Sequence, residues 1–330
     1  MKAVVCRGYG GAEVLHYEEV PKPAPVDDQV LIRVRAASVN PLDWRMISGK
    51  PRFVRLFMGM QRPKSIESGR DLAGTVEAVG TAVTRFQPGD DVFGVAPGAF
   101  AEYACTRQAT LALKPASVSF EQAAAVPIAA FTALQGLRDQ GKLQAGQRVL
   151  INGAAGGVGT FAVQFAKVLG AHVSAVCSTP NVEMVRSIGA DRVIDYTRED
   201  FTRGGERYDL IFDGTGNRSL AECRRVMTPT ATCVMAGMPH EGSGLMRIVM
   251  GRWIESMVRS GFTKQKFGMF IAKSDVADLA HIGEWMAAGH VKSVIVEPPY
   301  RLRDVPQAIA HQMKGHARGK LVVVVGPQDA

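Results

Sequence analysis

The sequence has 330 residues, of which 46% are hydrophobic and 35 are glycine, so it can bury a large core and exceeds the usual size of one compact domain. Its net charge of +8 comes from scattered Lys and Arg residues, without the long basic run or interleaved aromatic residues of a nucleic-acid groove. We therefore expect a soluble two-domain protein whose partner is an anionic small molecule rather than nucleic acid.

The N-terminus and the cysteines indicate the compartment. Residues 1–20 lack an apolar segment followed by a small-residue cleavage site, and every apolar run is too short to span a membrane. The cysteines are isolated, odd in number and never spaced as CxxC, which argues against a disulfide framework and a clustered zinc site: Cys6, Cys105, Cys177, Cys223 and Cys233. We expect a cytoplasmic protein without membrane contact, in which the cysteines are small buried hydrophobic residues.

The first third of the sequence predicts β structure. Residues 29–39 and 72–80 carry β-branched, partly alternating apolar patterns that are typical of strands. Pro88, Gly89 and Asp90 predict a turn between strands, because these residue types suit the backbone angles of tight turns. These features favour a small β-barrel or sandwich.

From about Phe120 the pattern changes to alternating strands and helices. Apolar segments predict six strands with helical segments in most of the gaps: residues 148–151, 173–176, 192–194, 209–212, 231–235 and 266–271. This alternation indicates a doubly wound parallel sheet in an α/β protein.

The tail after Lys273 has a different pattern. It predicts a helix over 274–289 that ends at a glycine, a short helix from Val305 and a closing strand over 319–325. We expect this tail to return to the first domain, so that the sheet domain is an insertion. The expected domain boundaries are residues 1–122, 123–273 and 274–330.

A glycine turn follows the predicted strand at 148–152. Gly153, Gly156 and Gly159 form a GxxGxxG pattern, in which the first glycine permits a tight exit, the second a close approach to a diphosphate, and the third close packing of helix on strand. An apolar stripe predicts the helix that follows and that ends at Gly170: Val158, Phe161, Ala162, Phe165, Ala166 and Leu169. Turns of this composition also join elements that bind nothing, but here the strand before the turn and the helix after it both favour a dinucleotide. The predicted diphosphate contacts are Ala155, Gly156, Gly157, Val158 and Gly159.

The tip of the second strand bears on the choice of dinucleotide. An acidic side chain there would accept hydrogen bonds from the ribose 2′-hydroxyl and select NAD, but the sequence has Ser178, Thr179 and Asn181. Hydroxyl and amide groups can donate to a 2′-phosphate, so NADPH is favoured over NADH. No Arg or Lys stands at this tip, which leaves the preference modest, and the same residues could instead cap the next helix.

Several separated segments resemble a known family. The sequences INGAAGGVGTFAVQFAK, GADRVIDYTRED, YDLIFDGTGN and GHARGKLVVVV, together with AASVNPLDWRMISG near the N-terminus, resemble the zinc-independent quinone oxidoreductase branch of the medium-chain dehydrogenase/reductase superfamily. The resemblance implies a GroES-like catalytic domain split around a Rossmann domain, with the nicotinamide of NADPH in the cleft between them. It also implies a homodimer formed by pairing the edge strands of two Rossmann sheets.

The resemblance implies further cofactor contacts. Asn40 and Thr132 would approach the nicotinamide ribose, and Ser178, Asn181 and Tyr196 would surround the 2′-phosphate. The remaining predicted cofactor contacts are Thr215, Ala236, Gly237, Phe270, Ala272 and Lys320.

The resemblance also bears on metal binding. Asn40 stands where zinc-dependent relatives carry the first catalytic cysteine, and Arg70 with Asp71 stands where they carry a His-Glu pair. The lobe with four clustered cysteines, which a structural zinc requires, is missing. We predict that no metal is bound, so the acceptor must already be electrophilic, as quinones and α,β-unsaturated carbonyl compounds are.

Candidate catalytic and substrate residues have structural alternatives. Asn40 and Asp43 are predicted as catalytic, although Asn40, Pro41 and Asp43 also fit the cap of a helix. Trp44, Arg70 and Arg247 are predicted to contact substrate, with His240 and Trp253 as weaker candidates, although Trp44 could be a packed aromatic residue and Arg70 could form an ion pair with Asp71.

We expect an NADPH-dependent quinone or enone reductase. Two alternatives remain at this point: an alcohol or aldehyde dehydrogenase of the same superfamily, which would require a metal, and a non-enzymatic relative that binds NADPH or nucleic acid.

Overall fold

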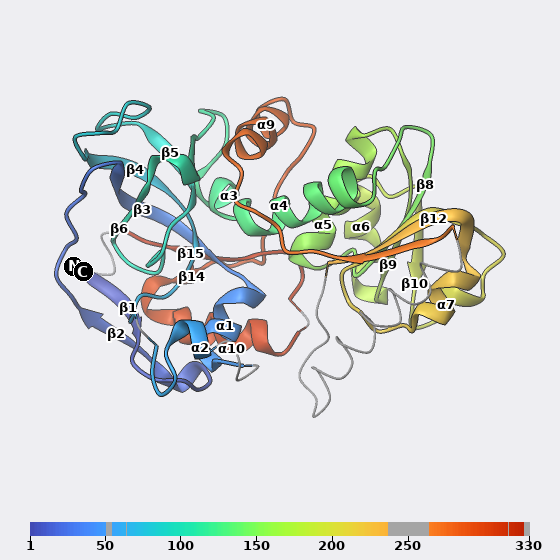
Figure 1. The fold of residues 1–330 in the computed structure, drawn as a ribbon, viewed down its shortest axis with the longest axis horizontal. Helices are drawn as coiled ribbons and strands as arrows, with labels where there is room; N and C mark the ends of the chain where they lie inside the picture. The colour runs from blue at the N-terminus through green and yellow to red at the C-terminus, as the bar shows by residue number, and fades with distance from the viewer. Residues whose placement is uncertain (51–54, 64, 237–263, 316, 327–330) are drawn as a thin grey trace. The chain divides into compact units, whose positions relative to one another are not determined.

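The chain folds into two units, one formed by residues 1–129 with 274–330 and the other by residues 130–273 (Figure 1). The computed structural model describes the chain except for residues 51–54, 64, 237–263, 316 and 327–330. Among the described residues, no helix has both the length and the apolar character needed to cross a membrane. The expected α/β class is confirmed.

The first unit is built mainly of antiparallel strands: β1 (Lys2–Cys6), β2 (Leu15–Glu19), β3 (Gln29–Val39), β4 (Asp71–Val79), β5 (Asp91–Val95), β6 (Tyr103–Arg107), β7 (Leu111–Leu113), β14 (Tyr300–Arg301) and β15 (Leu321–Val324). Their order in the main sheet is β14-β15-β3-β4-β5-β7, and β6 pairs with β3. The long strand β3 pairs with three others because β4 follows one edge, while β6 pairs with Gln29–Arg33 and β15 with Ala36–Val39 on the other. Strand β15 comes from the end of the chain and pairs with β3 of the first unit.

Short helices surround this sheet: α1 (Pro41–Ser48), α2 (Arg55–Met58), α3 (Phe120–Ala124), α9 (Val276–Ala287) and α10 (Val305–Met313). Helices α1 and α10 lie side by side, and α3 packs against β3 and β4 (Figure 1). The core joins apolar side chains from strands and helices, including Ile32, Leu72, Phe100, Val305 and Leu321, all fully buried. The predicted turn joins β4 to β5, and Gly89 adopts a positive φ of 97° there.

The second unit contains a six-stranded sheet in which every pair is parallel: β8 (Arg148–Asn152), β9 (His172–Cys177), β10 (Arg192–Asp195), β11 (Tyr208–Asp213), β12 (Met227–Met235) and β13 (Lys266–Met269). The six predicted strands are confirmed, and the last is shorter than predicted. The order β10-β9-β8-β11-β12-β13 places β8 at the point where the winding direction reverses, which is where doubly wound sheets bind ligands.

The helices of the second unit are α5 (Gly157–Val168), α6 (Val182–Ser187) and α7 (Leu220–Arg225). Helix α4 (Pro127–Gln135) runs across the division between the units and continues as a π-helical turn over Gly136–Gln140. Helix α5 buries every residue from Gly159 to Ala166, and the rings of Phe161 and Phe165 stack with centroids 5.8 Å apart. It ends as predicted, because Gly170 takes a φ of 78° directly after the helix.

Candidate functional site

The glycine turn between β8 and α5 has the geometry of a diphosphate-binding loop. Gly153 has a φ of 87°, which side chains rarely tolerate. A Cβ atom on Gly159 would overlap the carbonyl oxygen of Gly153 and lie 2.8 Å from Cα of Ala154, so packing of helix on strand requires glycine there. A Cβ atom on Gly156 would have its nearest neighbour at 3.5 Å, so this face of the turn is open. Gly153 and Gly159 therefore meet steric demands that only glycine satisfies, and the approach of a diphosphate to Gly156 stays a prediction.

The N-terminus of α5 adds electrostatic attraction for an anion. Gly156 is its N-cap and has no side chain to accept hydrogen bonds from the first amide groups of the helix. These amides and the positive end of the helix dipole favour a negatively charged ligand. The residues present therefore fit a dinucleotide.

The neighbouring strand end stabilises the glycine turn. The carboxylate oxygen Oδ1 of Asp213 accepts hydrogen bonds from Asn152 Nδ2 at 2.9 Å and from the backbone N–H groups of Thr215 and Gly216 at 3.2 and 2.8 Å. Thr215 lies against the turn, since a Cβ atom on Gly153 would be 2.5 Å from its Oγ1. Thr215 therefore lies beside the glycine turn, and its contact with a cofactor stays a prediction, whereas Asp213 was not predicted.

A carboxylate that was not predicted from the sequence lies beside the tip of β9. Asp195 ends β10 and pairs in register with Cys177, so its side chain reaches the segment that follows β9. Its Oδ2 accepts a hydrogen bond from the Thr179 hydroxyl at 2.6 Å, and its Oδ1 accepts one from the Thr197 hydroxyl at 2.8 Å. These bonds, the Thr179 bond above all, hold the pKa of Asp195 below its ordinary value. The register between β10 and β9 is the signal that could have predicted this contact, because it places Asp195 beside Cys177.

This carboxylate changes which groups can bind a 2′-phosphate. Thr179 donates its hydroxyl proton to Asp195, so that proton is not available to a phosphate oxygen. Ser178 accepts a hydrogen bond from Asn181 Nδ2 at 3.0 Å, which leaves the hydroxyl proton of Ser178 available to a ligand. Arg198, whose side chain is 76% exposed, approaches Asp195 at 3.5 Å and supplies the cation that the tip of β9 lacks.

The other predicted residues of the second unit lie at two places. Tyr196 is half-exposed after β10, and Ala236 follows β12, where its N–H donates to the Asp213 carbonyl oxygen at 3.0 Å. Phe270 and Ala272 follow β13, in a segment fixed to α4 by two hydrogen bonds of 2.9 Å between Gln135 and the backbone of Lys273. Thr132 lies in α4 itself. The predicted residues Gly237, His240, Arg247 and Trp253 lie outside the described residues.

Two predicted residues of the first unit, Asn40 and Lys320, form a buried polar cluster with Asp71. Lys320 Nζ donates a hydrogen bond to Asn40 Oδ1 at 2.6 Å, and Asn40 Nδ2 donates one to Asp71 Oδ2 at 2.8 Å. Lys320 Nζ is also 3.5 Å from Asp71 Oδ2, which makes a buried ion pair. All three residues are at most 3% exposed, and burial raises the pKa of Asp71 above its ordinary value. The side chains of Asn40 and Lys320 are therefore engaged with each other inside the unit.

The proposed ion pair between Arg70 and Asp71 is wrong. Asp71 points into the core and pairs with Lys320, whereas the Arg70 guanidinium contacts the sulfur of Met46 at 3.6 Å. The cause is strand alternation, because neighbouring residues at the start of a strand point to opposite sides. Trp44, predicted to contact substrate with core packing as the alternative, is 4% exposed and belongs to the hydrophobic core.

Asp43 caps helix α1, as its structural alternative predicted. Its Oδ2 accepts a hydrogen bond from the Asn40 backbone N–H at 2.7 Å, and Pro41 occupies the first helical turn. Its Oδ1 is buried and has no hydrogen-bond partner among the described residues. Burial raises the pKa of Asp43 to about 7, and the nearby carboxylate of Asp71 adds to this effect. Asp43 can therefore hold or release a proton near neutral pH.

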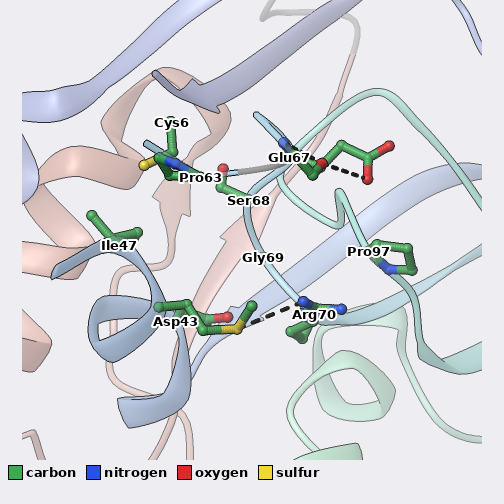
Figure 2. A pocket seen from close by; sticks show the side chains of 11 residues that line it. Cys6, Asp43, Ile47, Pro63, Glu67, Ser68, Gly69, Arg70 and Pro97 are labelled. Atoms are coloured by element: carbon green, nitrogen blue, oxygen red, sulfur yellow. Dashed lines mark hydrogen bonds between the residues drawn. The ribbon is translucent and has the colours of Figure 1, made fainter. Parts of the chain in front are cut away.

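Asp43 and Arg70 line a pocket in the first unit. Its volume is about 200 Å³, and its walls include Met46 and Ile47 from α1, Cys6, Pro63, Pro97 and the segment Ser68–Arg70. In Figure 2, Asp43 and Arg70 lie at one end of the pocket, and Cys6 and Pro63 at the other. The pocket is mainly apolar, and the polar side chains of Ser68 and Glu67 lie nearer the Cys6 end than Asp43 and Arg70 do (Figure 2).

Comparisons with known proteins agree with this geometry. Residues 26–116 match the family described as alcohol dehydrogenase GroES-like domain, and residues 188–323 match the family described as zinc-binding dehydrogenase. The chain is 35% identical to the NADPH-dependent alkenal/one oxidoreductase of Arabidopsis thaliana and 33% identical to the 2-methylene-furan-3-one reductase of Solanum lycopersicum. Each match covers 98% of this chain and 79% of the relative.

A solved structure shows the same fold. The quinone oxidoreductase from Coxiella burnetii has a TM-score of 0.84 and 28% identity, and the match covers 99% of each chain. The chain belongs to the medium-chain dehydrogenase/reductase superfamily, in its zinc-independent quinone oxidoreductase-like branch. The resemblance seen in the sequence is confirmed.

Proposed function

We propose that this protein is an NADPH-dependent oxidoreductase that reduces a quinone or an α,β-unsaturated carbonyl compound without a metal ion. The observation that carries the proposal is the 35% identity, over nearly the whole chain, to a relative named as an NADPH-dependent alkenal/one oxidoreductase. The open glycine turn at the reversal point of the sheet supports it independently.

The two strand ends of the second unit would hold the cofactor. The amides at the start of α5 would bind the diphosphate, and Ser178, Asn181, Tyr196 and Arg198 would bind the 2′-phosphate. Thr132, Ala236, Phe270 and Ala272 stay predicted contacts of the nicotinamide half. When bound, the nicotinamide supplies the hydride. The protein's own contribution is to bind, orient and exclude water.

The polar cluster of the first unit argues for metal-independent chemistry. At the position where zinc-dependent relatives carry a ligand, Asn40 binds the ammonium group of Lys320, and Arg70 adds a second cation nearby. The Lys320 ammonium group already occupies the Asn40 oxygen that a metal ion would need as a ligand. Among the described residues, no group of three His, Cys, Asp or Glu side chains is close enough together to bind a metal ion.

The proposal is tested by following NADPH oxidation with quinones, enones and simple aldehydes as acceptors. We expect turnover with the first two classes and little with simple aldehydes. Oxidation with simple aldehydes alone, together with stoichiometric zinc by elemental analysis, would instead establish the alcohol or aldehyde dehydrogenase alternative. Binding of NADPH without turnover, or salt-dependent RNA binding that NADPH does not compete, would establish the non-enzymatic one.

A homodimer is part of the proposal. Strand β13 is the edge of the parallel sheet, and Met269 and Ile271 at its end are 42% and 91% exposed. An edge strand with exposed apolar side chains favours pairing with a second copy. Light scattering on the purified protein would measure the mass directly.

The cytoplasmic location also stays a prediction. All five cysteines are thiols, which suits a reducing compartment. Two of the relatives have names that place them in the chloroplast and the mitochondrion. Fractionation of the source cells would decide.

A further inference from the structure

The pocket of the first unit has polar groups whose hydrogen-bonding capacity is not used. Oδ1 of Asp43 is buried without a partner among the described residues. The Arg70 guanidinium has five N–H donors, yet in the described part of the chain it contacts only the sulfur of Met46, which is a weak acceptor. Buried polar groups are normally hydrogen-bonded, so the Asp43 oxygen is an exception, whereas Arg70 is partly exposed and lines the pocket, where its remaining N–H donors can bind water or a ligand.

The other polar side chains of the pocket are already engaged. The Ser68 hydroxyl donates to the Val4 carbonyl oxygen, and the Cys6 thiol donates to the Gly8 carbonyl oxygen at 3.1 Å. Glu67 accepts a hydrogen bond from the Ser65 hydroxyl at 3.1 Å. Recognition of a ligand in this pocket therefore falls to Arg70 and Asp43, at the same end (Figure 2).

The chemistry of this pair favours a neutral oxygen acceptor. The positive charge of Arg70 attracts electron density on a ligand oxygen, but an ionised Asp43 beside it would repel a carboxylate or phosphate. A carbonyl oxygen carries no net charge and can accept from the guanidinium, and also from Asp43 when that acid is protonated. The apolar walls formed by Met46, Ile47 and Pro97 suit the hydrocarbon part of such a molecule.

The volume restricts the size of the ligand. An apolar cavity of about 150 Å³ holds one benzene molecule, so a pocket of about 200 Å³ holds roughly eight non-hydrogen atoms. Short-chain enals and enones fit within that volume, whereas a two-ring quinone would have to extend out of the pocket.

We propose that this pocket binds the carbonyl end of a short-chain α,β-unsaturated aldehyde or ketone, with the Arg70 guanidinium donating a hydrogen bond to the carbonyl oxygen. The inference rests on the proposed function and narrows its substrate class from quinones and enones to small enones. Arg70 orients and polarises the acceptor, because negative charge grows on the carbonyl oxygen as the β-carbon is reduced. A hydride added to the β-carbon leaves an enolate, and a proton from solvent added to the α-carbon then gives the saturated carbonyl compound.

The test compares Arg70 variants on substrates of two sizes. In Arg70→Met the methionine retains much of the side-chain volume and removes the donors, so kcat/KM for methyl vinyl ketone should fall about 10- to 100-fold. Arg70→Lys retains a cation and should recover part of that loss. Arg107→Met is the matched control, because Arg107 is 74% exposed and makes only a 3.9 Å ion pair in the same unit.

The comparison of two substrate sizes distinguishes substrate recognition by Arg70 from a purely structural role of this residue. The wild-type protein should prefer methyl vinyl ketone to a two-ring naphthoquinone, and Arg70→Met should reduce activity on the ketone far more than on the quinone. Equal losses on both substrates, with an unchanged NADPH Kd, would overturn the assignment of Arg70 while leaving the reductase activity in place. A wild-type preference for the naphthoquinone would overturn the size argument. If neither substrate is reduced, the proposed function itself fails.

Discussion

Replacing Gly156 or Gly159 with alanine separates the two roles of the glycine turn. At Gly156 the new Cβ atom meets its nearest neighbour at 3.5 Å and φ is −80°, so alanine fits the folded backbone. Alanine has less backbone freedom than glycine in the unfolded chain, which stabilises the folded protein, but it is a poorer N-cap, which destabilises it. The free energy of unfolding should therefore change by less than about 1 kcal/mol. The added methyl group nevertheless occupies the surface that the diphosphate approaches. The loss of one or two hydrogen bonds should raise the NADPH Kd about 10- to 100-fold.

Gly159→Ala should instead lower the stability of the folded protein. The new Cβ atom overlaps the Gly153 carbonyl oxygen and lies 2.8 Å from Cα of Ala154, and backbone atoms at these positions cannot move aside without separating helix α5 from strand β8. Overpacking of this kind costs about 1–3 kcal/mol. Thermal unfolding and titration of NADPH by fluorescence, measured on both variants, test the pair. Wild-type affinity in Gly156→Ala, or an unchanged unfolding midpoint in Gly159→Ala, would refute the reasoning.

Three further predictions concern charged groups. Burial raises the pKa of Asp43 to about 7, so the folded state binds its proton more tightly than the unfolded state does. The free energy of unfolding, measured by urea denaturation, should therefore fall by up to about 4 kcal/mol as pH rises from about 4 to 7. In Asp43→Asn this part of the pH dependence should be flatter. Lys320→Met leaves Asp71 without its cation and should lower the free energy of unfolding by about 3–5 kcal/mol, and by less at low pH, where Asp71 is protonated. Adding Asp71→Asn should restore much of this stability, and a double variant without recovery would contradict the ion pair. Arg198→Gln should raise the Kd of NADPH about 5-fold and leave that of NADH unchanged, whereas equal effects on both would show that Arg198 does not bind the 2′-phosphate.

The local sequence was sufficient to predict the elements of the fold. The six strands of the second unit and the helix from Gly157 to Val168 follow from apolar periodicity, which is a property of neighbouring residues. The roles of Gly153 and Gly159 could be predicted for the same reason, because a tight turn between a strand and a helix has the same steric demands in any protein. The cap formed by Asp43 on α1 is also local, since its partner is three residues away.

Only the tertiary structure decided which distant side chains meet. Asp195 reaches Thr179 because β10 pairs with β9 in a particular register, and Lys320 reaches Asn40 because β15 pairs with β3. Arg70 and Asp71 are adjacent in the sequence, yet the start of β4 directs one into the pocket and the other into the core. Strand order and register follow from the packing of the whole chain, which local periodicity does not encode. The sequence by itself therefore determined the glycine turn, whereas the fold determined the partners of the charged residues around the candidate site.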